Sequence, residues 1–493
     1  MSDIGLFGLA VMGQNFALNM AEHGFSVSVA NRSPEKVDTT VKRAQTEGPG
    51  GKPLPLTGHK DMKEFVASLA KPRKIIILVM AGAPVDATIK GLVEAGLEEG
   101  DLVVDGGNEW FPNSLRRAKE LEPKGIMFMG MGISGGEEGA RKGPSLMPGG
   151  PPAAYALMEP IITKCSAQVG GEPCTFNIGD VGSGNYVKMI HNGIEYGDMQ
   201  LIAEIYDVLR YAGEMDNEEL AATFKSWHED TELNSFLIEI TGIILGTKDD
   251  QEGKDGYIVD QILDKTGMKG TGRWTIQEAA ERSVCGSVMA AALDARYVSG
   301  RKDERVAASS ILGGPVEVPR VDKEQLIDDC RQALFAAKIV SYAQGLCLIR
   351  EAGVQLGWAI DLGECARIWR GGCIIRAQFL NDITEAFKSN PGLTNLMVDP
   401  KFSAWLNERQ PSWRRVVSLC VASGLPVPAL SASIAYFDSY RRANVNANLV
   451  QGMRDFFGGH TFERKDMEGK FHCYWTEGHK PLDDIASRTG GEV

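Results

Sequence analysis

Short apolar runs alternate with helical patterns along the chain up to about residue 180. The runs "DIGLFG", "FSVSVAN", "KIIILVM", "DLVVDGG" and "GIMFMGM" are rich in aliphatic and β-branched residues, as buried strands are. Between them, apolar positions recur with helical spacing at 11–23, 61–69 and 84–97. This alternation predicts a Rossmann-like α/β domain at 1–179, with a parallel, doubly wound sheet and right-handed crossovers. The Gly/Pro-rich stretch "EGPGGKPLPL" is predicted to be a loop inside it.

From about residue 180 the strand pattern gives way to long helical periodicity. Stretches such as 187–211 and 332–352 predict a large all-helical domain at 180–442. Two sequence echoes, short segments that recur in similar form, lie within it. "RYAG" recurs as "REAG" and "SFLIEIT" recurs as "QFLNDIT", each about 140 residues later. A tryptophan precedes both "SFLIEIT" and "QFLNDIT". The echo indicates a duplicated helical unit, with chance similarity between helices as the alternative.

The last segment, 443–493, mixes glycine, aromatic and charged residues. It is too irregular for a bundle helix and too aromatic for a disordered tail. We expect it to pack onto another surface, and a second subunit is the natural candidate.

Composition and charge narrow the class of protein. The 493 residues are 43% hydrophobic and 24% charged, typical of a globular protein of two or three domains. The net charge of −13 argues against a nucleic-acid partner. Nine cysteines without a CxxC pair, and scattered histidines, favour reduced thiols and no metal site. The densest apolar run, Ile75–Ala81, is far shorter than the ~20 residues of a membrane span. With no leader pattern at the N-terminus, we expect a cytoplasmic location, unless a leader has been removed.

A glycine-rich turn follows the first predicted strand. The motif "GLAVMG" is a GxGxxG fingerprint with alanine in the second glycine position, and it opens a helical pattern. Such a turn aims the amides at the helix N-terminus toward a pyrophosphate, whereas a plain glycine turn is the alternative. The strand before it and the strand after its helix favour a dinucleotide site. Its candidate cofactor-binding residues are Gly8, Leu9, Ala10, Val11, Met12 and Gly13.

The end of the second predicted strand distinguishes between the two nicotinamide cofactors. An NAD site typically has an Asp or Glu there, but this chain has Asn31, Arg32 and Ser33. A carboxylate would repel a 2′-phosphate, while an arginine and polar neighbours would bind it. The sequence predicts NADP; a solvated surface arginine is the alternative.

The segment "VKMIHNGIEYGDMQ" carries polar groups in a helical pattern. At 100° per residue, Lys188, His191, Asn192 and Glu195 fall on one face of the helix. They can form a solvated polar stripe, but such stripes usually alternate Lys and Glu. A lysine and a glutamate two turns apart can act as a separate base and acid.

Two glycine-rich stretches follow further predicted strands. "GISGGEEGARKGPSLMPGG" strings glycines beside Ser134, and "DGGN" ends another strand. For each taken alone, a plain turn in the chain is the alternative. Because ligands bind at the carboxyl edge of open α/β sheets, their placement favours one shared cleft.

These motifs together carry a family resemblance along essentially the whole chain. "GLAVMGQN", "NRS", "DGGNEW", "SGGEEGARKGPSLMPGG", "VKMIHNGIEYGDMQ", "KGTGRWT", "RQALFAAKIVSYAQG" and "RDFFGGHTFER" make the chain resemble the decarboxylating 6-phosphogluconate dehydrogenases. The resemblance implies NADP-dependent oxidative decarboxylation of 6-phospho-D-gluconate to ribulose 5-phosphate. It implies that Lys188 is the base and that Glu195 protonates C1.

The resemblance also implies a homodimer whose active site is shared between subunits, because family members contribute their tail to the partner's site. The implied substrate contacts are Asn108, Ser134, Gly135, Gly136, His191 and Asn192 for the sugar acid, and Tyr196, Lys269, Arg296, Arg454 and His460 for the phosphate. Further implied cofactor contacts are Val79, Met80, Ala81 and Asn108.

The chain departs from the common family pattern in two places. Met80 stands where many members have lysine, which removes a positive charge near the cofactor. Val181, Ser183 and Asn185 differ just before the predicted catalytic helix. A non-decarboxylating β-hydroxyacid dehydrogenase and an inactive scaffold remain as alternatives, but neither explains both the phosphate cluster and the retained Lys188 and Glu195.

Overall fold

The computed structural model describes residues 1–251, 254–268, 270–315, 319–476 and 483–484. Contacts between residues divide the chain into two compact units, Met1–Ile434 and Ala435–Val493, and each unit is described by itself.

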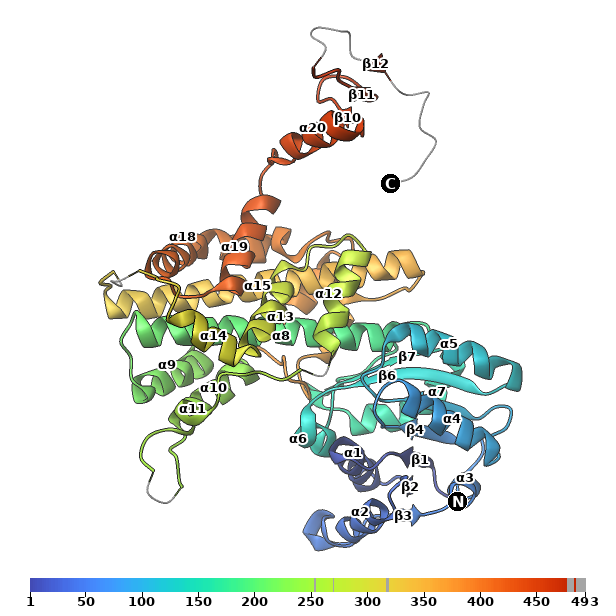
Figure 1. The fold of residues 1–493 in the computed structure, drawn as a ribbon. Helices are drawn as coiled ribbons and strands as arrows, with labels where there is room; N and C mark the ends of the chain where they lie inside the picture. Colours follow the sequence, from blue (N-terminus) through green and yellow to red (C-terminus); the bar gives the residue numbers. More distant parts are fainter. Residues whose placement is uncertain (252–253, 269, 316–318, 477–482, 485–493) are drawn as a thin grey trace. The chain divides into compact units, whose positions relative to one another are not determined.

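A mostly parallel sheet forms the first part of the large unit (Figure 1). Its strands are β1 (Ile4–Phe7), β2 (Val27–Ala30), β3 (Leu56–His59), β4 (Lys74–Ile77), β5 (Leu102–Asp105), β6 (Met127–Ile133) and β7 (Leu146–Gly149). Their order is β3-β2-β1-β4-β5-β6-β7, and only β7 runs antiparallel to its neighbour. The order reverses its direction beside β1, so a crevice opens at the carboxyl ends of the strands there.

Helices cover both faces of this sheet. They are α1 (Val11–Glu22), α2 (Pro34–Thr46), α3 (Met62–Ala67), α4 (Ala83–Glu94), α5 (Phe111–Leu121), α6 (Gly136–Lys142) and α7 (Pro152–Cys165), with short 3₁₀ turns η1 (Pro49–Gly51) and η2 (Glu122–Lys124). Residues alternate between two cores along each strand: Ile76 packs with α1, α2 and α7, whereas Ile75 and Ile77 pack with α3, α4 and α5. This period of two confirms the doubly wound α/β prediction.

Two strands differ from the sequence prediction. The stretch "EGPGGKPLPL" was predicted to be entirely loop, but its last residue begins β3. The glycine-rich stretch "GISGGEEGARKGPSLMPGG", for which no element was predicted, contains α6 and β7. Both strands lie at the edges of the sheet, where Gly58 and Pro148 are tolerated and a continuous apolar run is not required.

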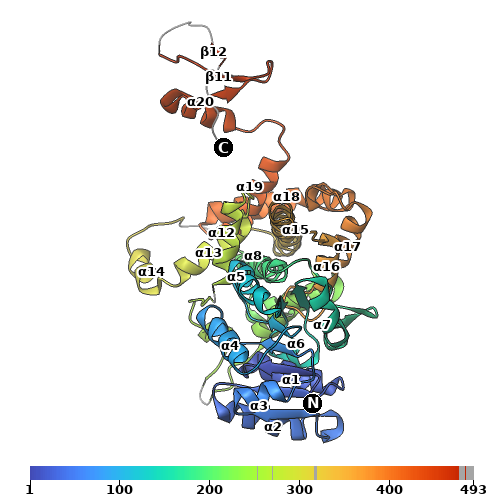
Figure 2. The same ribbon diagram turned by 90° about the vertical axis from the view of Figure 1, so that its right-hand side faces the viewer.

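The rest of the large unit is helical, as predicted (Figure 2). Its helices are α8 (Ser183–Tyr211), α9 (Asn217–Asp230), α10 (Phe236–Gly246), α11 (Ile258–Gln261), α12 (Thr271–Glu281), α13 (Ser287–Ser299), α14 (Lys302–Ser309), α15 (Lys323–Leu356), α16 (Leu362–Ile368), α17 (Leu380–Ser389), α18 (Pro400–Ser423) and α19 (Pro428–Tyr440), whose last residues lie in the second unit. Minor elements are β8 (Gln168–Val169), β9 (Glu172–Pro173) and η3 (Leu396–Val398).

The long helices α8 and α15 form the centre of the helical part. Asp198 of α8 and Lys338 of α15 make a buried ion pair of 2.7 Å between them. In the part of the chain that the structure describes, α15 alone is long and apolar enough to span a membrane, yet 89% of its most apolar window is buried inside the fold. Helix α15 is therefore a core helix of the fold.

The two sequence echoes occupy equivalent elements. "RYAG" ends α8 and "REAG" lies near the end of α15, while "SFLIEIT" and "QFLNDIT" belong to α10 and α17. The two copies also meet, because Phe236 N–H donates to Arg376 O at 3.0 Å and Gln378 N–H donates to Asn234 O at 2.9 Å. This matching order of helices is the arrangement expected of a duplicated unit.

The second unit contains α20 (Ala447–Gly458) and a small antiparallel sheet of β10 (Phe462–Glu463), β11 (Lys470–His472) and β12 (Asp483–Asp484). The buried carboxylate of Asp455 holds it together. This carboxylate accepts hydrogen bonds from Thr461 N, Cys473 N and Trp475 Nε1, and it contacts His472 Nδ1 at 2.9 Å. The described part of the tail is therefore held together by its own polar core.

Candidate active site

One cleft collects most of the candidate residues. It has a volume of about 970 Å³ and lies where β1, β4, β5 and β6 end, facing α8, α12 and α13. The structure therefore brings the separate glycine-rich stretches to one place. The predicted site residues that line it are Ala10, Val11, Met12, Gly13, Val79, Met80, Asn108, Ser134, Gly135, Gly136, Lys188, Asn192, Glu195, Tyr196 and Arg296.

The other predicted residues lie elsewhere. Gly8, Leu9, Ala81 and His191 lie within two residues of lining residues in the chain, and Asn31, Arg32 and Ser33 follow β2; none of these seven lines the cleft. Lys269 lies outside the described residues. Arg454 and His460 belong to the second unit.

The turn between β1 and α1 has the shape that a dinucleotide site requires. Gly8 has φ +108°, and a Cβ there would lie 2.3 Å from Leu78 O. A Cβ at Gly13 would lie 1.8 Å from Gly8 O, so the helix packs directly on the turn. No side chain caps the N-terminus of α1. Ala10 to Gly13 at this end of the helix line the cleft, and no described side chain competes for their amides, as binding of an anionic pyrophosphate requires.

The three residues after β2, Asn31 to Ser33, differ in their contacts and exposure. The Asn31 side-chain oxygen accepts a hydrogen bond of 2.9 Å from Leu9 N, so this side chain fixes the glycine-rich turn. Arg32 is exposed, and Ser33 is the N-cap residue of α2 without a side-chain cap hydrogen bond. An exposed guanidinium beside a helix N-terminus, with no carboxylate at these three positions, fits a 2′-phosphate.

Lys188 is buried at the floor of the cleft, with a relative exposure of 6%. Its Nζ donates to Asn192 Oδ1 at 2.8 Å and lies 3.4 Å from His191 Nδ1. Burial lowers the pKa of Lys188, and the charge of Glu195 on the same wall opposes that shift. A neutral amine is thereby made accessible at a lower pH than for an exposed lysine.

The burial of Lys188 depends on a close approach between β6 and α8. A Cβ at Gly132 would lie 2.3 Å from Lys188 Cβ, so only glycine allows this spacing. The strand thus presses against the helix at the position that carries the lysine.

His191 lies behind the lysine and is fully buried. Its Nε2 lies 3.4 Å from Ser134 Oγ, and its ring stands edge-on to Trp369 at 5.6 Å between centroids. Burial, with the charge of Lys188, lowers the pKa of His191 well below its usual value. A neutral imidazole therefore connects the lysine to the serine on β6.

The far wall of the cleft carries Tyr196 and Arg296. The guanidinium of Arg296 stacks over the Tyr196 ring, 3.6 Å from its centroid, and donates to Gly267 O at 3.1 Å. Asn192 Nδ2 donates to Thr271 Oγ1 at 3.2 Å, which ties α8 to α12. This wall presents one arginine whose planar group is held in a fixed orientation.

The sequence motifs assign no role to several residues that line the cleft. Thr271 lies in the quoted motif "KGTGRWT" but was given no role, and Ile374 follows an unremarked "GGC". Cys373 lies near the lysine but does not line the cleft; burial raises the pKa of its thiol to about 12, so the thiol is neutral. The paired glycines before it were the available signal. Among the residues that the structure describes, no cluster of His, Cys, Asp or Glu suits a metal ion.

Oxidation of an alcohol needs a hydride acceptor and a base, and the cleft offers a dinucleotide turn on one side and a buried lysine on the other. The class that fits is the nicotinamide-dependent dehydrogenases.

Comparison with known proteins gives the family. The model of the NAD binding domain of 6-phosphogluconate dehydrogenase matches residues 3–179, and the model of the 6-phosphogluconate dehydrogenase C-terminal domain matches residues 184–475. The chain belongs to the 6-phosphogluconate dehydrogenase family.

Individual relatives agree over nearly the full length. The chain is 59% identical to 6-phosphogluconate dehydrogenase, decarboxylating 1, of Spinacia oleracea, covering 96% of this chain and 97% of the relative. It is 55% identical to the chloroplastic decarboxylating 2 protein of the same plant, covering 97% and 88%. The 6-phosphogluconate dehydrogenase of Plasmodium falciparum, solved in apo form and with NADP⁺ or 6-phosphogluconate, superimposes with a TM-score of 0.91 at 47% identity, covering 96% and 100%.

Proposed function

We propose that the protein catalyses the oxidative decarboxylation of 6-phospho-D-gluconate to D-ribulose 5-phosphate and CO₂, with reduction of NADP⁺ to NADPH. One observation carries the proposal: buried Lys188 and half-buried Glu195 line the same cleft as the dinucleotide turn. The chain-long similarity to decarboxylating 6-phosphogluconate dehydrogenases supports this substrate and this cofactor.

Lys188 and Glu195 divide the proton transfers. When bound, NADP⁺ supplies the acceptor for the hydride from C3. Neutral Lys188 takes the proton of the 3-hydroxyl, and the resulting β-keto acid loses CO₂ because its new carbonyl is an electron sink. Protonated Lys188 then donates to that carbonyl oxygen as the enediol forms. Glu195 protonates the carbon that carried the carboxylate, which becomes C1 of ribulose 5-phosphate, while Lys188 takes back the enediol hydroxyl proton and the ketone forms. The lowered pKa of Lys188 supports its part in the first step.

The remaining candidates hold the two ends of the substrate. In this proposal the sugar acid contacts Asn108, Ser134, Gly135, Gly136, His191 and Asn192. Its phosphate contacts Arg296, with Tyr196 beneath the guanidinium, and Lys269. A free sugar acid would not require these cations, which favours a phosphorylated substrate over the smaller acids of other β-hydroxyacid dehydrogenases.

NADP is favoured over NAD by the end of β2. Arg32 and Ser33 would hold the 2′-phosphate, while Asn31 would keep the glycine-rich turn in register beneath the pyrophosphate. The cofactor contacts in this proposal are Gly8, Leu9, Ala10, Val11, Met12, Gly13, Asn31, Arg32, Ser33, Val79, Met80, Ala81 and Asn108.

The active enzyme in this proposal is a homodimer with shared active sites. The chain divides into an NADP-binding domain at 1–179, a helical substrate and dimerisation domain at 180–442 and a tail at 443–493. The tail of one subunit would bring Arg454 and His460 to the phosphate in the other subunit's cleft. The exposed apolar side chains of α20, including Phe457 at 73% exposure, support a partner surface for this tail.

A cytoplasmic location completes the proposal. A relative whose name carries no organelle matches this chain at 59% identity, against 55% for the chloroplastic one. Imaging of a fluorescent fusion of the full-length protein tests it, and an organellar signal would contradict it.

A single assay tests the reaction. Purified protein is mixed with 6-phosphogluconate and NADP⁺, and both NADPH absorbance and released CO₂ are measured, with Lys188→Ala as the control. We expect equal amounts of NADPH and CO₂. No signal above the control would refute the assignment, and NADPH without CO₂ would favour a non-decarboxylating dehydrogenase. A parallel assay with NAD⁺ should be much less efficient if Arg32 and Ser33 select the 2′-phosphate.

A further inference from the structure

Arg117, a buried arginine on α5, contacts residues that adjoin two loops on the cofactor side of the cleft. The side chain of Arg117 is 1% exposed, and its guanidinium lies 2.6 Å from Glu109 Oε2, 3.2 Å from Asp105 Oδ2 and 2.8 Å from Asp86 Oδ1. It also donates to Gly82 O at 3.0 Å. Arg117 does not line the cleft, and the proposed proton transfers do not involve it.

Glu109 binds the other backbone group of the same residue, Gly82. Its Oε2 accepts from Gly82 N at 2.8 Å, and its Oε1 accepts from Trp110 N and Asn113 Nδ2, both at 2.9 Å. Burial raises the pKa of Glu109, but the hydrogen bonds from Gly82, Asn113 and Arg117 together bring it below its usual value. Gly82, at φ +86°, thus donates its N–H to the Glu109 carboxylate and accepts at its C=O from the Arg117 guanidinium.

Gly82 is the last residue of one loop that lines the cleft. Arg117 also contacts Asp105, which directly precedes a second such loop. Leu78, Val79 and Met80 line the cleft just before Gly82, and Gly106, Gly107 and Asn108 line it after β5. Asp105 accepts from Gly107 N at 3.0 Å through the oxygen that does not face Arg117. The two loops touch, because a Cβ at Gly107 would lie 3.3 Å from Val79 O.

We propose that Arg117 and Glu109 are positioning residues for the cofactor: they form a buried clamp that fixes the two cleft loops in the arrangement that NADP(H) binds. The clamp rests on the proposed function for the identity of the dinucleotide. Stability alone is a poor explanation for it, since a buried ion network is often no more stable than apolar residues of the same volume. What such a network provides is a defined geometry, because each charge must face its partner.

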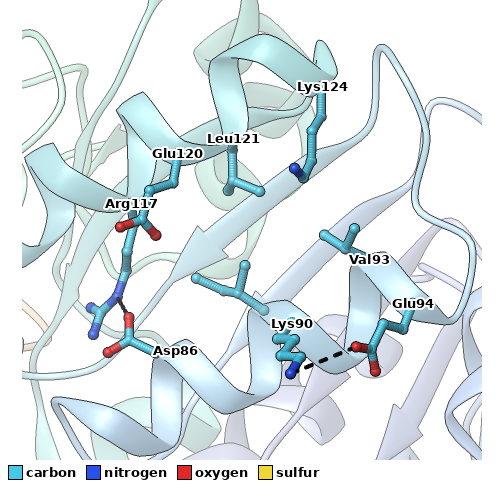
Figure 3. Close-up of a pocket in the computed structure, with 9 residues that line it drawn as sticks. Asp86, Lys90, Val93, Glu94, Arg117, Glu120, Leu121 and Lys124 are labelled. Atoms are coloured by element: carbon cyan, nitrogen blue, oxygen red, sulfur yellow. Dashed lines mark hydrogen bonds and ion pairs between the residues drawn. The ribbon is translucent and has the colours of Figure 1, made fainter.

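The outer side of the clamp faces a second pocket, between α4 and α5 (Figure 3). This pocket, of about 300 Å³, shares no lining residue with the cleft, and Asp86 and Arg117 meet in its wall. Arg116, the next residue on α5, also binds Asp86 at 2.8 Å, but from the solvent side and with 44% of its side chain exposed. Arg116 donates to Asp86 and Glu120, neither of which lies on a cleft loop. Arg116 is therefore a matched control.

The test compares Arg117→Gln and Glu109→Gln with Arg116→Gln in the full-length enzyme. NADPH affinity is measured by fluorescence titration, and KM is measured separately for NADP⁺ and for 6-phosphogluconate. We expect both clamp variants to raise the Kd for NADPH and the KM for NADP⁺ by about tenfold, because misplaced loops lose several contacts at once. The KM for 6-phosphogluconate should rise less, by about threefold at most, because Asn108 alone of its proposed contacts lies on these two loops. Arg116→Gln should behave as wild type.

Three results would overturn the clamp: an unchanged Kd for NADPH, equal weakening of both ligands, or an equally large effect of Arg116→Gln. Direct NADPH binding separates this proposal from the reaction, because wild-type protein that binds NADPH without turning over 6-phosphogluconate refutes only the latter. If Arg117→Gln does not fold, Arg117→Lys keeps the charge beside Glu109 while losing the fork that reaches Gly82. It should fold and still raise the Kd for NADPH, and wild-type affinity in Arg117→Lys would refute the clamp.

Discussion

At the scale of single residues, the charge of Glu195 changes the pKa of Lys188. Burial lowers the pKa of Lys188, and the Glu195 carboxylate opposes that shift by stabilising the ammonium form. The reaction needs the neutral amine, so kcat/KM should rise with pH through the pKa of Lys188. The position of that acid limb therefore reports the balance between burial and the carboxylate.

Glu195→Gln should move the acid limb to lower pH. Removing the negative charge destabilises the ammonium form, so Lys188 loses its proton at a lower pH than in the wild type. The value of kcat should fall at every pH because the proton donor to C1 is lost. The measurement is a profile of kcat/KM against pH for both proteins. A limb that stays in place or moves to higher pH would contradict the proposed coupling.

Met80 is the residue at which this chain departs from the common pattern beside the cofactor. Its side chain is 78% exposed and lines the cleft. Met80→Lys should lower the KM for NADP⁺ by about two- to fivefold, as expected for one exposed charge near a polyanion. The gain should disappear in high salt, since the lysine is solvent-exposed. Met80→Gln is the neutral control, and a gain shared by Gln would show that charge is not the cause.

Packing between β6 and α8 positions the catalytic lysine at the scale of elements. Gly132→Ala would place a methyl group 2.3 Å from Lys188 Cβ, so the strand and helix must separate. We expect a loss of about 1–3 kcal/mol in the free energy of unfolding, and a fall in kcat because Lys188 moves. Denaturant unfolding and steady-state kinetics measure the two effects. Gly91→Ala, where the nearest atom is Met62 Cε at 3.5 Å, is the control and should be neutral or slightly stabilising. Wild-type stability and kcat in Gly132→Ala would disprove the close-packing argument.

Elements with their own local pattern were predictable, and those defined by neighbours were not. The apolar runs predicted β1, β2, β4, β5 and β6, and helical spacing predicted α8 and α15. β3 and β7 are edge strands with glycine or proline, so hydrogen bonding to a neighbour defines them more than their own residues do.

The same distinction applies to the site. The glycine-rich turn and the polar face of α8 are local motifs, and the sequence located both. The role of Asn31 in cofactor binding stays a prediction, whereas the hydrogen bond that its side-chain oxygen accepts from Leu9 N, 22 residues away, is not visible in the local motif. Arg117 received no role, because its contacts with Gly82 and Asp105 exist only once the sheet has formed.

The tail raises a question that belongs to the whole molecule. Asp455 is the one buried residue of α20, all of whose residues are described, and Leu449, Val450, Phe456 and Phe457 are each more than half exposed. An ordered helix with this much apolar surface is expected to be covered in the active assembly. If a second copy covers it, each active site contains residues from two chains, and inactive variants can complement each other.

Lys188→Ala and Arg454→Ala should each be nearly inactive, yet co-expression of the two chains should restore activity. In a mixed dimer, the cleft that keeps Lys188 receives the intact Arg454 from the other chain, while the second cleft lacks both residues. Random pairing makes half of the dimers mixed and completes one of their two sites, so about a quarter of wild-type activity is expected. Co-expression of Lys188→Ala with Glu195→Gln is the control, because both residues lie on α8 of one chain and no pairing completes a cleft. Recovery in the first mixture alone would establish sharing of the tail, and absence of recovery in dimers verified as mixed would mean that each chain builds its site alone.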